Sequence, residues 1–110
     1  MISEQHDNHV LLVDEYHDMP AFANFLTGIW EQFTGQNVVI DLSKYKEATL
    51  QEFLAFLWLS NEHRATKQSF IIINDALSAG DNPEELLIVP TYQEAKDVIE
   101  MEEIERDLGF

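Results

Sequence analysis

Asn37-Val38-Val39-Ile40-Asp41-Leu42 is the most informative run of this sequence. It is rich in β-branched residues and shows little alternation between apolar and polar positions. That pattern is typical of a strand covered on both faces, as in a parallel sheet, so we expect this run to form a central strand. Ser69-Phe70-Ile71-Ile72-Ile73 has the same character and predicts a second buried strand. Leu86-Leu87-Ile88-Val89 predicts a short last strand before Pro90.

The chain before the central strand predicts a β-hairpin and then a helix. Val10-Leu11-Leu12-Val13 is a short apolar run that follows a polar, turn-forming stretch, so residues 2–13 are expected to form two paired strands. Asp18 stands before Met19-Pro20, where a proline in the first helical turn tolerates its missing N–H. Apolar residues then recur at three- and four-residue spacing, which predicts an amphipathic helix that Gly35 ends.

The second predicted helix is unusually apolar. Thr49-Leu50-Gln51-Glu52 is a capping box, and the helix is expected to run from Leu50 to about Thr66. Its apolar residues are Leu50, Phe53, Leu54 and Leu57 on one face, with Phe56, Trp58 and Leu59 extending that surface around the helix. A helix apolar on nearly all sides is either buried on two sides or presented to a partner. Phe56, Trp58 and Leu59 are therefore candidate interface residues, and the alternative is that Phe56 and Trp58 pack under a neighbouring helix or the long loop.

The last part of the chain is acidic. Residues 75–84 contain enough Gly, Asn and Pro to predict a loop, and the Thr91 hydroxyl can cap a final helix. Residues 91–110 are thus expected to form an acidic helix and tail, with carboxylates at Glu100, Glu102, Glu103, Glu105 and Asp107. This segment is either a solvated helix with a frayed end or an arm that docks its apolar side and Phe110 on a basic partner. Phe110 is accordingly a candidate interface residue.

Composition limits the class of protein. The 110 residues suit one domain, 1–110, and six Lys and Arg against 21 Asp and Glu give a formal net charge of −15. Such a charge repels phosphate backbones and anionic lipids, so we expect neither nucleic acid nor membrane as a partner. The chain has no cysteine, which excludes disulfides and favours the reducing cytoplasm. It also has no run approaching the roughly 20 apolar residues of a membrane span.

Catalytic and ligand motifs are sparse. Asp41 and Ser43 follow the central strand, at the end where α/β sheets commonly place ligands, so they are ligand candidates; the alternative is that they form an ordinary turn. The four histidines lie in three different predicted elements and match no metal-binding spacing. There is no Gly-rich phosphate loop and no nucleophile elbow. We therefore expect no cofactor, no metal and no enzymatic activity.

The predicted order of hairpin, helix, strand, helix, strand, loop, strand and helix favours a mixed sheet covered by helices. This order resembles the STAS domain family, whose best-known members are anti-sigma-factor antagonists. Three stretches carry the resemblance: Gln5-His6-Asp7-Asn8-His9-Val10, Val38-Val39-Ile40-Asp41-Leu42-Ser43 and Pro90-Thr91-Tyr92-Gln93-Glu94-Ala95. Residues 99–110 resemble the ending of short acidic STAS-like proteins encoded beside ribonuclease Z in some bacteria.

The resemblance implies a single α/β STAS-like domain that binds proteins, with a kinase or an anti-sigma factor as partner. Antagonists of this family carry an Asp-Ser-Ser-Gly-like motif before the second helix, and a partner kinase phosphorylates its serine. This chain has Glu47-Ala48-Thr49-Leu50-Gln51-Glu52 there, so Thr49 is the candidate phosphoacceptor; the alternative is that it only caps the helix.

Two other functions stay open. One is an adaptor for a nucleic-acid enzyme such as a neighbouring ribonuclease Z, with the acidic surface facing a basic groove. The other is a small-molecule binder at Asp41 and Ser43. A homodimer also stays open.

Overall fold

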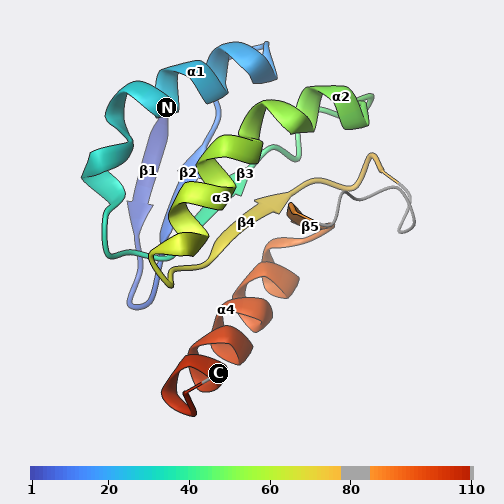
Figure 1. The fold of residues 1–110 in the computed structure, drawn as a ribbon. Helices are drawn as coiled ribbons and strands as arrows, with labels where there is room; N and C mark the ends of the chain where they lie inside the picture. The colour runs from blue at the N-terminus through green and yellow to red at the C-terminus, as the bar shows by residue number, and fades with distance from the viewer. Residues whose placement is uncertain (78–84, 110) are drawn as a thin grey trace.

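A computed structural model describes residues 1–77 and 85–109 of the chain. Within these residues one five-stranded sheet forms, with the strands in sequence order across it (Figure 1). The strands are β1 (Ile2–Gln5), β2 (Val10–Val13), β3 (Val38–Asp41), β4 (Phe70–Ile73) and β5 (Leu87–Val89). β1 runs antiparallel to β2, and the other neighbours are parallel. The predicted α/β fold, a mixed sheet opened by an N-terminal hairpin, is confirmed.

Strand β3 is the middle strand, as its sequence predicted. Val38 pairs with Val10 of β2 on one side and with Phe70 of β4 on the other. Val38, Val39 and Ile40 are all completely buried, although consecutive side chains point to opposite faces of a sheet. Helices therefore cover both faces of the sheet at this strand.

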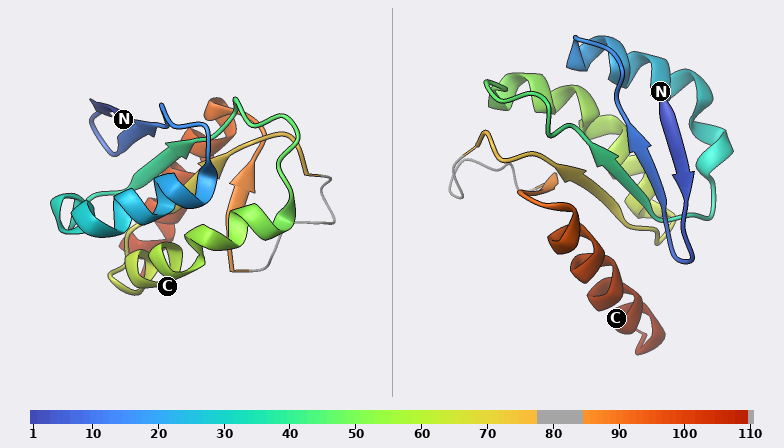
Figure 2. Two further views of the ribbon diagram at one scale, coloured as in Figure 1. Left: turned by 90° about the horizontal axis from the view of Figure 1, so that it is seen from above. Right: turned by 180° about the vertical axis from the view of Figure 1, so that it is seen from behind.

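The helices form two layers around the sheet (Figure 2). One layer contains α1 (Met19–Ile29), the 3₁₀ turn η1 (Trp30–Phe33), α2 (Leu50–Phe53), the 3₁₀ turn η2 (Leu54–Phe56) and α3 (Leu57–Ala65). The other contains α4 (Tyr92–Asp107). Ala95 and Ile99 of α4 pack on Val39, Ile71 and Val89, and this forms a second, smaller core on the far face of the sheet.

Local chemistry sets the limits of the first helix. The Asp18 carboxylate accepts a hydrogen bond from the Ala21 N–H at 3.1 Å, which satisfies one free donor at the start of α1. Gly35 has a φ of +81°, a left-handed conformation that glycine adopts without steric cost. The predicted start of this helix is found in the structure. The α-helix itself ends at Ile29, earlier than predicted, and the 3₁₀ turn η1 continues to Phe33, two residues before Gly35.

The second predicted helix differs from expectation, because it is interrupted. α2 lasts one turn and tightens into η2 before α3 begins. Residues three apart are eclipsed in a 3₁₀ turn, so the tightening places Phe53 and Phe56 on the same side of the segment. Both are completely buried, and Leu59, a further three residues along, is 1% exposed. The interruption thus directs three large side chains into one core.

Candidate interaction surface

Phe56 and Leu59 were wrong as interface candidates. Phe56 packs edge-on against Phe22 of α1, with ring centroids 6.4 Å apart, and Leu59 lies in the same core cluster. Neither side chain reaches the surface, so neither can contact a partner. The alternative, that Phe56 packs under the neighbouring helix, describes its position. Phe110 lies outside the described residues.

Trp58 is the most exposed of the large apolar residues of this segment. It is 57% exposed, although an indole ring is among the largest apolar groups that a protein can bury. It stands at a groove of about 320 Å³ formed between the end of the first helical segment and α3. The groove is lined by Thr27, Gly28, Trp30, Glu31, Thr34, Trp58, Glu62, His63 and Thr66. Both tryptophans of the chain therefore line one groove.

A buried histidine holds the first tryptophan in place. The Trp30 indole N–H donates to Nδ1 of His63 at 3.2 Å, and Nε2 of His63 donates to the Gln36 carbonyl oxygen at 2.6 Å. Because Nδ1 accepts and Nε2 donates, the ring is neutral. Burial lowers the pKa of His63 below its ordinary value; the Gln36 carbonyl partly offsets this shift, and the nearby Arg64 adds to it. The wall of the groove is thus fixed by a neutral histidine, a role that no sequence motif indicates.

Acidification is expected to weaken this arrangement. The pKa of His63 is lower in the folded chain than in the unfolded chain, where it is about 6.5. The contribution of His63 to stability is therefore complete when the pH is above the pKa of the unfolded state, and it is lost as the pH falls through the pKa of the folded state. His9, whose pKa is also lowered, contributes with the same sign. We expect His63→Gln to reduce the loss of melting temperature between pH 7 and pH 5 relative to the unmodified chain, because glutamine does not titrate. Thermal unfolding followed by circular dichroism measures this difference, and parallel pH profiles for the two proteins would contradict it.

Thr49 occupies the predicted capping box. Its backbone N–H donates to Oε1 of Glu52 at 3.1 Å, and its hydroxyl lies 3.3 Å from the same oxygen. Both halves of the box are present, so the capping interpretation of Thr49 and Glu52 is confirmed. The Thr49 side chain is also exposed, and the adjoining Leu50 is 40% exposed. The start of α2 is therefore accessible from solvent.

Asp41 and Ser43 form a turn. The Asp41 carboxylate accepts the Ser43 N–H at 2.9 Å, which is the alternative interpretation of this pair. A cavity of about 320 Å³ at the same end of the sheet is lined by Asn74, Asp75, Leu77, Ile88, Val89, Pro90 and Glu94. Neither Asp41 nor Ser43 is among the residues that line this cavity.

Buried polar residues next to this turn brace the strand ends. Asp14 accepts hydrogen bonds from the Tyr16 N–H at 2.6 Å and from the Tyr45 hydroxyl, and burial together with Asp14 raises the pKa of Tyr45. The Asn74 amide donates to the carbonyls of Leu42 at 2.8 Å and Tyr45 at 3.0 Å. These bonds join the loops after β2, β3 and β4. The sequence carries no local signal for the bonds between different loops, because their partners are 29 to 32 residues apart.

A histidine cluster links the hairpin to α4. His6 and His9 stack with ring centroids 4.8 Å apart. Nδ1 of His9 donates to the Asn8 side-chain oxygen at 2.6 Å, so Nε2 is left to accept from the Tyr92 hydroxyl at 2.6 Å. Burial lowers the pKa of His9, and the charges of His6 and Lys96 lower it further. Within residues 1–77 and 85–109, no three His, Asp or Glu side chains are grouped so that they could hold a metal ion.

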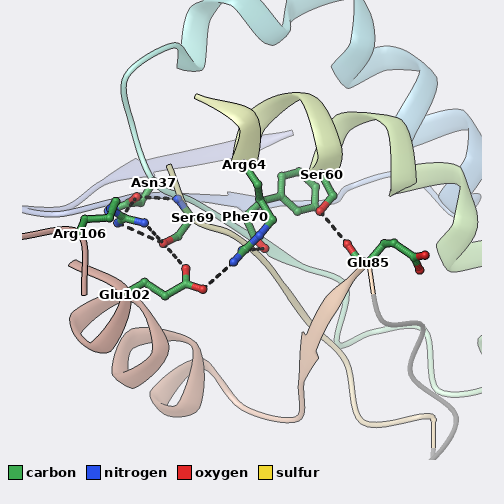
Figure 3. Close-up of polar contacts among 8 residues, drawn as sticks. All are labelled: Asn37, Ser60, Arg64, Ser69, Phe70, Glu85, Glu102 and Arg106. Carbon is green, nitrogen blue, oxygen red and sulfur yellow. Dashed lines mark hydrogen bonds and ion pairs between the residues drawn. The ribbon is translucent and has the colours of Figure 1, made fainter. Parts of the chain in front are cut away.

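The acidic helix α4 is fastened to the sheet at its C-terminal half (Figure 3). Glu102 accepts hydrogen bonds from Arg64 at 2.6 Å and from the Ser69 hydroxyl at 2.5 Å. Arg106 donates to the Asn37 side-chain oxygen at 3.2 Å and to the Ser69 hydroxyl at 3.3 Å. The two arginines of the chain both take part. Part of the negative charge of α4 is therefore neutralised within the molecule.

In comparisons with known proteins, no protein-family model, curated protein or solved structure matches this chain. Within the described residues, no helix has the length and apolar character needed to cross a membrane.

Proposed function

We propose that this chain is a STAS-like, non-enzymatic protein-interaction module that acts in a regulatory complex. The observation that carries the proposal is Trp58, which is 57% exposed beside a groove that also contains Trp30. Exposed tryptophans beside a groove are typical anchors of protein interfaces, where a few aromatic and arginine residues contribute most of the binding energy. The two phenylalanines of the preceding elements, Phe53 of α2 and Phe56 of η2, are completely buried. Exposure of Trp58 is therefore not a general property of this segment.

Thr49 provides the regulatory step of the proposal. A partner kinase would transfer the γ-phosphoryl group of ATP to Oγ1 of Thr49, with ADP as the leaving group and with loss of the hydroxyl proton that now faces Glu52. Phosphorylation adds about −1.5 to −2 charge, which would lie beside the Glu52 carboxylate. Repulsion between the two groups would loosen the cap of α2, a turn that leads through η2 into the helix carrying Trp58. Phosphorylation would thereby change the affinity of the partner.

The test is capture of partners from the native cytoplasm with tagged protein, at low salt and with identification by mass spectrometry. We expect a kinase or an anti-sigma factor to be recovered, to be lost with Trp58→Ala and to be retained with Met101→Ala. Met101 is the matched control because it is 60% exposed and lies on α4, on the opposite face of the sheet. The same spectra report whether Thr49 carries phosphate.

Four outcomes would count against the proposal. Ribonuclease Z or another nuclease as the Trp58-dependent partner would replace it with the adaptor function. Equal loss with both variants would mean that Trp58 is not the anchor. Reproducible recovery of the chain without a partner would overturn protein binding, and an unmodified Thr49 under several growth states would overturn the regulatory step.

A further inference from the structure

The groove contains more than an exposed indole. We infer that it takes an arginine side chain from a basic segment of the partner, an inference that rests on the proposed function and names the chemistry of the partner. Trp30 and Trp58 supply two aromatic rings, and Glu31 and Glu62 supply two carboxylates. Aromatic rings and carboxylates together recognise a cation that also has an extended planar surface.

The Trp30 ring is preorganised for this role. Its indole N–H is already bonded to His63. The centroid of its ring lies 5.3 Å from that of Phe33 and 5.6 Å from that of Phe70. A ring held on three sides loses little freedom when a guest stacks on it, and preorganisation of this kind increases affinity. Tryptophan also offers the most favourable ring face for a cation.

The carboxylates of the groove are available. Glu31 and Glu62 are exposed, and no cation among the described residues forms an ion pair with either. Arg64, two residues beyond Glu62 along α3, pairs instead with Glu102 of α4. A formal net charge of −15 adds a field that attracts positive segments from a distance.

Size and geometry favour arginine. A volume of about 320 Å³ lies at the lower limit of ligand pockets, which span roughly 300–1,000 Å³, and suits one long side chain. A guanidinium group is planar, stacks on aromatic faces and bonds carboxylates with two parallel N–H donors, whereas a lysine ammonium does neither. We therefore expect arginine to be preferred over lysine.

The two tryptophans provide the readout, because both line the groove. Intrinsic fluorescence is titrated with a peptide of alternating arginine and serine, and with matched peptides that carry lysine or glutamine in place of arginine. We expect saturable binding of the arginine peptide, weaker binding of the lysine peptide and no binding of the glutamine peptide. The double variant Glu31→Gln, Glu62→Gln should weaken arginine binding by at least about tenfold. Trp58→Ala removes one of the two tryptophans that give the fluorescence signal. Binding of the arginine peptide to this variant is therefore measured by calorimetry.

The control is the double variant Glu100→Gln, Glu105→Gln, which removes the same charge from exposed positions of α4. An equal loss of affinity in the control would show diffuse attraction and overturn the inference. Equal binding of the lysine peptide, or equally tight binding of free arginine amide, would overturn it as well. If arginine fails to bind while capture of a partner still depends on Trp58, the arginine anchor is wrong and the interaction surface stands. If Trp58-dependent capture fails too, the proposed function falls with it.

Discussion

Phe56→Ala is expected to lower the free energy of unfolding by about 3–5 kcal/mol, whereas Trp58→Ala, two positions along the chain, is expected to change it by less than about 1 kcal/mol. Phe56 is completely buried against Phe22, and truncation of such a side chain leaves a cavity that the close-packed core fills only in part. Trp58 leaves most of its surface in water. Urea denaturation followed by circular dichroism measures both changes.

Phe56→Leu is the matched control for this pair. It keeps an apolar side chain in the same site, so its cost should lie well below that of Phe56→Ala. Similar free energies of unfolding for Phe56→Ala and Trp58→Ala would contradict the assignment of one side chain to the core and the other to the surface.

Asn37→Ala is expected to lower the free energy of unfolding by about 2–4 kcal/mol. Asn37 is buried and joins four groups: its amide nitrogen donates to the Asn8 carbonyl at 2.9 Å and to Glu103 at 3.0 Å, and its oxygen accepts from the Ser69 N–H at 2.8 Å and from Arg106 at 3.2 Å. Truncation removes four hydrogen bonds in a region that is buried or partly buried, where a polar group left without its partner costs more than the loss of a solvated bond. Hydrogen exchange should show the largest loss of protection in α4.

Ser60→Ala provides the comparison. Ser60 is also buried, but among the described residues its side-chain hydroxyl bonds only to the Glu85 carbonyl, at 3.3 Å, and Glu85 is exposed (Figure 3). We expect a cost of about 1 kcal/mol or less. If Asn37→Ala were no more destabilising than Ser60→Ala, the network around Asn37 would not hold α4 on the sheet.

Much of the fold could be predicted because its causes are local. The central strand follows from the β-branched run at residues 38–41, and the helix starts follow from the cap at Asp18 and the capping box at Thr49. The interruption of the second helix was not predicted, because periodicity does not distinguish an α-helical from a 3₁₀ turn over three residues. That one turn decides which aromatic residues reach the core. It explains why Phe56 and Leu59 are buried, whereas Trp58 is exposed and stays a candidate.

The site could be predicted only in part, because its contacts join distant segments. Trp30 and His63 are 33 residues apart, and His9 and Tyr92 are 83 apart. No spacing rule connects such pairs, since their approach depends on sheet order and on the helices that cover each face. The sequence therefore indicates which single residues can take part in a site, but it does not predict which of them lie together.

The fastening of α4 bears on how the chain folds as it is synthesised. Asn37 and Ser69 leave the ribosome long before Glu102 and Arg106, so they spend that interval without their native partners. Ile71, Ile73 and Val89 are likewise uncovered until Ala95 and Ile99 follow. The nascent chain can assemble the sheet and pack α1 and α3 on one of its faces, while the other face still exposes apolar side chains of the strands. Completion of the fold, and any protection of those strands from aggregation or from chaperone capture, therefore awaits the release of α4.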